Sequence, residues 1–82
     1  MQINLHVTFT DKTEVEVVAV AADIVAFENH FDMSVAKLEK EVRLTHLLFI
    51  AYSQQRRTKA TDLDFEKWVE NVAEIKELTP KK

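Results

Sequence analysis

Glycine and cysteine are both absent from this sequence of 82 residues, and proline occurs only once. Without glycine, the chain cannot form the glycine-rich loops that bind phosphate groups or dinucleotides. Without cysteine, disulfides and thiolate ligands are excluded, so the sequence is compatible with a reducing compartment. The longest apolar run, residues 47–52, is far too short to span a membrane. The sequence therefore directs attention to a small soluble protein whose turns are made by residues other than glycine.

The composition is that of one small globular domain. Apolar residues make up 46% of the chain and charged residues 30%, which is too apolar for a disordered protein. The formal net charge of −3 argues against a general nucleic-acid binder, because such a protein needs a basic face. We expect one domain over residues 1–78 and a short tail at 79–82.

Alternating apolar and polar residues predict a β-hairpin over residues 2–20. A loop at residues 11–13 would place Phe9 opposite Val15 and bring the apolar residues of both strands to one face. Val18 and Val20 would then lie on the other face. Either a helix covers these two valines, or they form an exposed patch or sheet edge used for assembly.

Helical spacing of apolar residues follows the hairpin. It predicts helices at about residues 24–31, 35–40, 42–57 and 62–77, the first of them capped by Asp23. In the last of these, Trp68 is more typical of a core than of an interface. The predicted fold class is thus α+β, with an N-terminal antiparallel hairpin followed by three to four helices.

The segment 42–57 is the longest predicted helix. Its main apolar stripe consists of Leu44, Leu47, Leu48 and Ala51, but from residue 47 to residue 52 it is apolar nearly all round. Such a helix is buried on more than one side. Either it is the central helix of the domain, or part of it contacts another chain. A buried strand is the other interpretation of so short an apolar run.

No pattern of residues indicates catalysis. The three histidines, His6, His30 and His46, lack metal-ligand spacing. The glutamates of the last helix lie opposite its apolar stripe, as on a solvated surface. Arg56, Arg57 and Lys59 form the only basic cluster, without interleaved aromatic residues. We therefore expect no enzymatic activity, no metal and no cofactor.

A set of packing motifs follows the predicted hairpin in a fixed order. It consists of Asp23, Ile24, Val25, Ala26, Phe27, Glu28, His30 and Phe31, then Arg43, Leu44, His46, Leu47, Leu48, Ala51 and Tyr52, then Arg56 and Arg57, and last Asp62, Phe65 and Trp68. Together with the hairpin, this order resembles the small tail assembly chaperones of long-tailed (siphovirus-type) bacteriophages, and the similarity covers nearly the whole chain. The residue after Phe31 is often glycine in this family and is Asp32 here.

The resemblance implies a non-catalytic viral protein of the host cytoplasm. Such chaperones bind the long, helix-rich tape measure protein and keep it soluble during tail assembly, and they can form homo-oligomers. Binding would use apolar surface that the monomer cannot bury. The residues predicted for it are Val18, Val20, Phe49, Ile50 and Tyr52. We expect neither nucleic acid nor membrane as a partner.

Two other functions remain open at this point. A structural virion component, such as a head–tail or tube-associated subunit, would stay in finished particles, whereas a chaperone would not. A small nucleic-acid-binding regulator would bind in a strongly salt-dependent way.

Overall fold

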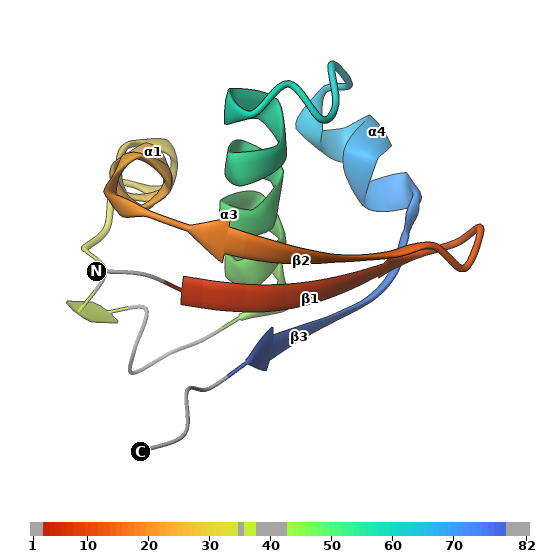
Figure 1. Ribbon diagram of the computed structural model, residues 1–82. Coiled ribbons are helices and arrows are strands. Elements are labelled where there is room, and N and C mark those ends of the chain that lie inside the picture. The colour runs from red at the N-terminus through yellow and green to blue at the C-terminus, as the bar shows by residue number, and fades with distance from the viewer. Residues whose placement is uncertain (1–2, 35, 38–42, 79–82) are drawn as a thin grey trace.

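The computed structural model describes residues 3–34, 36–37 and 43–78 (Figure 1). The predicted hairpin is present: strand β1, Ile3–Phe9, pairs antiparallel with strand β2, Glu14–Ala19. It is only part of the sheet, however, because a third strand, β3 (Val72–Leu78), pairs antiparallel with the other side of β1. The strand order is β2-β1-β3.

The predicted fold class is wrong, because the sheet has a third strand near the C-terminal end of the described residues. We expected strands only at the N-terminus and a helix over residues 62–77, but strands lie at both ends of the described chain. Helix α4 covers only Phe65–Glu70, and β3 follows directly after Asn71. The fold of the described residues is α+β with three antiparallel strands and three helices, not a hairpin followed by helices.

A β-bulge explains why this strand resembles a helix in the sequence. Val72 and Ile75 are three residues apart, which is helical spacing, and in a regular strand they would point to opposite faces. The pairing with β1 shifts here: Val72 lies opposite Phe9, and Ile75 lies opposite Val7. One extra residue on β3 thus brings both side chains to the face that the helices cover. Both are partly buried against the core.

The turn of the hairpin also differs from the prediction. The loop consists of Thr10, Asp11 and Lys12, so Val7, not Phe9, lies opposite Val15. Lys12 adopts a left-handed conformation with φ 75°, which the β-branched Thr13 could adopt only at greater cost. A shift of two residues keeps every side chain on its face, so the predicted core set is unchanged.

The side chain of Asp11 stabilises this turn. Its Oδ1 accepts hydrogen bonds from the Thr13 hydroxyl (2.6 Å) and from the Thr13 backbone N–H (3.0 Å). Because both bonds favour the charged carboxylate, they lower the pKa of Asp11 below its ordinary value. A short polar side chain thus stabilises the turn in a sequence without glycine.

Helices α1 (Ala21–Phe31) and α3 (Leu44–Arg57) correspond to two of the predicted helices. Helix α1 begins earlier than expected, so Asp23 lies in its first turn and does not precede it. Asp32 ends α1 in the left-handed conformation, with φ 53°. The predicted segment 35–40 lies mostly outside the described residues, as does the tail 79–82.

All three helices lie on the same side of the sheet (Figure 1). Helix α3 contacts α1, α4 and every strand, so it is the central helix of the domain. The fully buried residues of the core are Leu5, Val7, Val17, Ala19, Phe27, Ile50 and Ala51. None of the helices in the described ranges is long and apolar enough to cross a membrane.

Candidate protein-binding surfaces

Two of the five residues predicted to bind a partner are buried in the domain, and a third is partly buried. Ile50 is fully buried and Phe49 is buried. Tyr52 is partly buried, and its hydroxyl donates a hydrogen bond of 2.7 Å to the Leu63 carbonyl. In this fold, Phe49 and Ile50 therefore contribute to the core and offer no surface to a partner.

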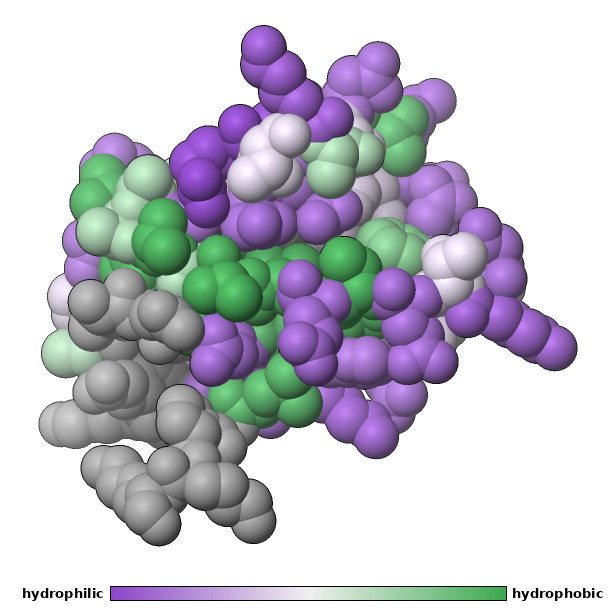
Figure 2. All heavy atoms as spheres, viewed as in Figure 1, coloured by the Kyte–Doolittle hydropathy of each residue, from purple (hydrophilic) through white to green (hydrophobic). Residues whose placement is uncertain are grey.

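The other two predicted residues are exposed. Val18, with 42% of its surface exposed, lies on the face of the sheet that faces away from the helices, opposite Asn4 of β1. Val20, 37% exposed, is the N-cap residue of α1. In the view of Figure 2, hydrophobic side chains form separate patches with hydrophilic side chains between them. No described helix covers either valine.

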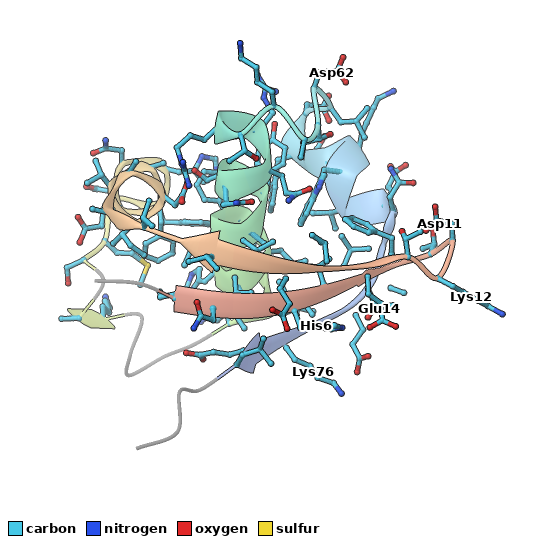
Figure 3. All side chains as sticks on the ribbon, viewed as in Figure 1. His6, Asp11, Lys12, Glu14, Asp62 and Lys76 are labelled. Carbon is cyan, nitrogen blue, oxygen red and sulfur yellow. The ribbon has the colours of Figure 1, made fainter. Side chains whose placement is uncertain are left out.

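The rest of the open sheet face is mostly polar. His6 Nε2 and Glu14 Oε1 lie 2.8 Å apart, and Lys76 of β3 lies across β1 from Glu16 of β2, opposite His6. Figure 3 shows His6, Glu14 and Lys76 on the side of the sheet away from α3 and α4. Such a face is typical of an antiparallel sheet with one face in water.

An apolar hollow of the surface lies between α3 and α4. This groove has a volume of about 540 Å³. Its lining residues are Thr45, Leu48, Phe65, Glu66, Val69 and Glu70. Leu44 lies one helical turn before Leu48 on the same face of α3 and is 62% exposed, although the sequence places it in the main apolar stripe. The apolar strip therefore continues past the end of the groove.

Acidic side chains form one wall of this groove. Glu66 and Glu70 are four residues apart, so they project from the same face of α4 beside Val69. Both are exposed, and neither forms an ion pair within the part of the chain that the structure describes. The groove combines an apolar floor with negative charge along one side, which favours an apolar ligand with a basic flank.

A second hollow of about 310 Å³ lies between the hairpin turn and the loop before α4. Phe9 and Trp68 line it together with polar residues of the turn and the loop, among them Asp11, Thr13 and Thr61. Because its lining is more polar, it is less suited than the α3–α4 groove to bind an apolar side chain.

A buried carboxylate joins α1 to α3. Asp23 is fully buried and accepts hydrogen bonds from Arg57 Nε (3.1 Å), Arg57 Nη2 (3.0 Å), Ser53 Oγ (3.1 Å) and the Val20 backbone N–H (3.0 Å). The hydrogen bonds that Arg57 donates to Asp23 raise the pKa of Arg57, because they favour its charged form. Both carboxylate oxygens of Asp23 accept hydrogen bonds from groups of the same domain. Asp23 is therefore a structural residue.

Several of the residues that carry the resemblance pack neighbouring elements together. Phe27, Phe31 and His46 form ring contacts between α1 and α3, and Tyr52, Phe65 and Trp68 form them between α3 and α4. The buried Asp23 forms an ion pair with Arg57, which is partly exposed. The motif is therefore a packing pattern of this fold.

The sequence alone did not indicate the groove. Leu44 and Leu48, and likewise Phe65 and Val69, have the i, i+4 spacing of one helix face, but that spacing does not tell which face remains open. Within the described ranges, no group of three His, Asp or Glu side chains converges in a way that could hold a metal ion. Comparison of the chain with protein-family models, curated proteins and solved structures finds no match.

Proposed function

We propose that this protein is a non-catalytic tail assembly chaperone of a long-tailed bacteriophage, which binds the tape measure protein in the host cytoplasm and keeps it soluble. The observation that carries the proposal is the open apolar groove between α3 and α4, with Leu44 beside it and Glu66 and Glu70 along one wall. The resemblance of nearly the whole chain to this chaperone family supplies the identity of the partner.

The shape and charge of the groove suit a helix as the ligand. An amphipathic helix presents apolar residues at i, i+3 and i+4, which match a strip that runs along two helices. Lysine or arginine residues beside that stripe would face Glu66 and Glu70. The expected ligand is therefore a helical segment of the tape measure protein with an apolar stripe and a basic flank. Binding would cover apolar surface that otherwise promotes aggregation.

Co-expression with the tape measure protein encoded in the same genome tests the function. We expect the tape measure protein to become soluble and to co-purify with this chain. If it stays insoluble and unbound, the chaperone proposal fails. Mass spectrometry of purified virions addresses the alternative, because a structural virion component would be present in finished particles and a chaperone would be absent.

A matched pair of charge reversals tests the groove as the binding surface. Glu70→Lys places a positive charge on the groove wall, whereas Glu16→Lys makes the same change on the open face of the sheet. We expect at least tenfold weaker binding for Glu70→Lys and unchanged binding for Glu16→Lys, because only the former opposes a basic ligand. If Glu16→Lys weakens binding and Glu70→Lys does not, the proposed function would still hold, but the binding site would lie on the open sheet face that carries Val18.

A further inference from the structure

Strand β3 forms an edge of the sheet that no described strand covers. One side of Val72–Leu78 pairs with β1, and the strand order β2-β1-β3 leaves its other side without a neighbouring strand in the described residues. The outward backbone N–H and C=O groups of such an edge can pair with a strand of another chain. The side chains along this edge then decide which strand fits.

The centre of β3 has a self-complementary charge pattern. Glu74 and Lys76 lie opposite Thr8 and His6, so both point to the open face of the sheet. Their side chains are 57% and 65% exposed, and they are 3.9 Å apart. Ile75 lies between them on the face that the helices cover, where it is partly buried. One negative and one positive charge thus follow each other on the open face of β3, and Ile75 lies at the midpoint between them.

We propose that β3 pairs antiparallel with β3 of a second copy of this chain, about a two-fold axis at Ile75. In that register, Glu74 of each copy lies directly opposite Lys76 of the other, which gives two ion pairs on the open face. The two Ile75 side chains meet on the helix side. The sheet becomes six-stranded, and the interface is isologous, as two-fold symmetry requires.

The charges select this register over its neighbours. A two-fold axis at Glu74 places two glutamates directly opposite each other, and an axis at Lys76 places two lysines opposite each other. Directly opposite like charges destabilise a strand pair, whereas opposite charges stabilise it. A shift of one residue would place the helices of the second copy on the other side of the sheet. Of these registers, only the one with its axis at Ile75 places opposite charges across the interface and keeps the helices of both copies on the same side of the sheet.

A charge-reversal cycle tests the interface by sedimentation velocity over a range of protein concentrations. Lys76→Glu creates two like-charged pairs, and we expect the dissociation constant of the dimer to rise roughly tenfold or more. Glu74→Lys should act in the same way. The double variant Glu74→Lys/Lys76→Glu restores opposite charges across the axis, so we expect it to dimerise like the original chain. A chain that stays monomeric at all concentrations overturns the proposal.

Because the chain contains no cysteine, single cysteines can report the register. An equimolar mixture of the Glu74→Cys and Lys76→Cys variants should form a disulfide-linked heterodimer on oxidation, because directly opposite residues are about 4.5–5.5 Å apart between Cα atoms. Each variant alone pairs diagonally, at about 7–8 Å, and should remain mostly unlinked. Equal linkage in all three samples would rule out this register.

These residues lie outside the α3–α4 groove, so the inference does not depend on the proposed function. Loss of dimerisation in Lys76→Glu with intact binding of the tape measure protein would separate the two surfaces. Conversely, Glu70→Lys should leave the dimer unchanged. An unchanged dissociation constant in Lys76→Glu contradicts the edge pairing, whatever the result of the co-expression experiment.

Discussion

Helix α3 packs against α1 and α4 in two different ways. Toward α1, the interface is closed at one end by the ion pair of Asp23 with Arg57 and at the other by ring contacts of His46 with Phe27 (5.3 Å) and Phe31 (4.9 Å). Toward α4, ring contacts of Tyr52 hold the interface, and an apolar groove remains open beside them.

The difference indicates how this small domain divides its apolar surface. The α1 side uses a fully buried carboxylate, which specifies a single arrangement because its hydrogen-bonding partners must all be in place. The α4 side has a helix of only six residues, which is too short to cover the N-terminal part of α3 around Leu44. We infer that the α1 side stabilises the fold and that the α4 side is the one that binds.

The largest predicted effect is the loss of the carboxylate on the α1 side. Asp23→Ala removes the partner of Arg57 and leaves the Ser53 hydroxyl and the Val20 N–H without their acceptor. We expect the free energy of unfolding to fall by about 3 kcal/mol, at the lower end for a broken buried pair because the Arg57 side chain is 40% exposed. Urea denaturation measures the change.

The exposed residue Asp62 supplies the control for this variant. Asp62 lies in the loop before α4, on the surface of the molecule (Figure 3). Asp62→Ala should change the free energy of unfolding by no more than about 0.5 kcal/mol. If Asp62→Ala and Asp23→Ala lower the free energy of unfolding equally, the ion pair of Asp23 with Arg57 does not make the α1 side of α3 more strongly held than the α4 side.

The α1 side also contains a buried group that is not satisfied. His46 is 7% exposed, and its Nδ1 has no hydrogen-bond partner among the described residues. His46→Phe retains an aromatic ring between Phe27 and Phe31 and removes the buried polar atom. We expect the free energy of unfolding to rise by about 1 kcal/mol, because an unpaired buried polar group costs about that much or more.

Thermal unfolding checks this prediction, with a rise of about 4–8 °C in Tm for 1 kcal/mol in a domain of this size. His6→Phe serves as the control, because His6 lies on the open face and is not enclosed by rings. A lower Tm for His46→Phe would contradict the prediction. It would mean that the larger phenyl ring does not fit and that the smaller imidazole ring is needed at this position.

The sequence predicts the hairpin and the central helix because each depends on local spacing. Alternation over Ile3–Phe9 predicts a strand, and the apolar run around Ile50 favours a buried helix, although a buried strand also fits so short a run. By contrast, the spacing of Val72 and Ile75 suits a helix equally well. What decides for a strand is the uncovered edge of β1, together with a bulge that brings both side chains to the core. Such a tertiary effect overrides local propensity.

The candidate groove could not be predicted for a related reason. Its floor depends on how far α4 extends along α3, and the prediction of a helix over 62–77 was too long. A longer α4 would have covered the strip at Leu48, and Leu44 would have joined the core as its place in the apolar stripe suggests. In fact the strand β3 begins at Val72, so Leu44 stays exposed. The open groove is therefore a consequence of the third strand.

The smallest predicted effect concerns the hydrogen bond on the α4 side. Tyr52→Phe removes the hydroxyl that donates to the Leu63 carbonyl at 2.7 Å, but that carbonyl still accepts from Arg56 Nη1 at 3.0 Å. Since the acceptor keeps a partner, we expect a loss of only about 0.5–1 kcal/mol by urea denaturation. The ring contacts with Phe65 and Trp68 are retained.

A double-mutant cycle with Arg56→Met makes the comparison stricter. Arg56 Nη1 also donates to the Tyr52 hydroxyl, at 3.1 Å, so the two side chains share one small network. Once Arg56 is replaced, Tyr52→Phe leaves the Leu63 carbonyl without either donor, and the cost of that change should rise. If Tyr52→Phe alone costs as much as Asp23→Ala, the α4 side is as strongly specified as the α1 side, and the groove would have to be regarded as a rigid part of the fold.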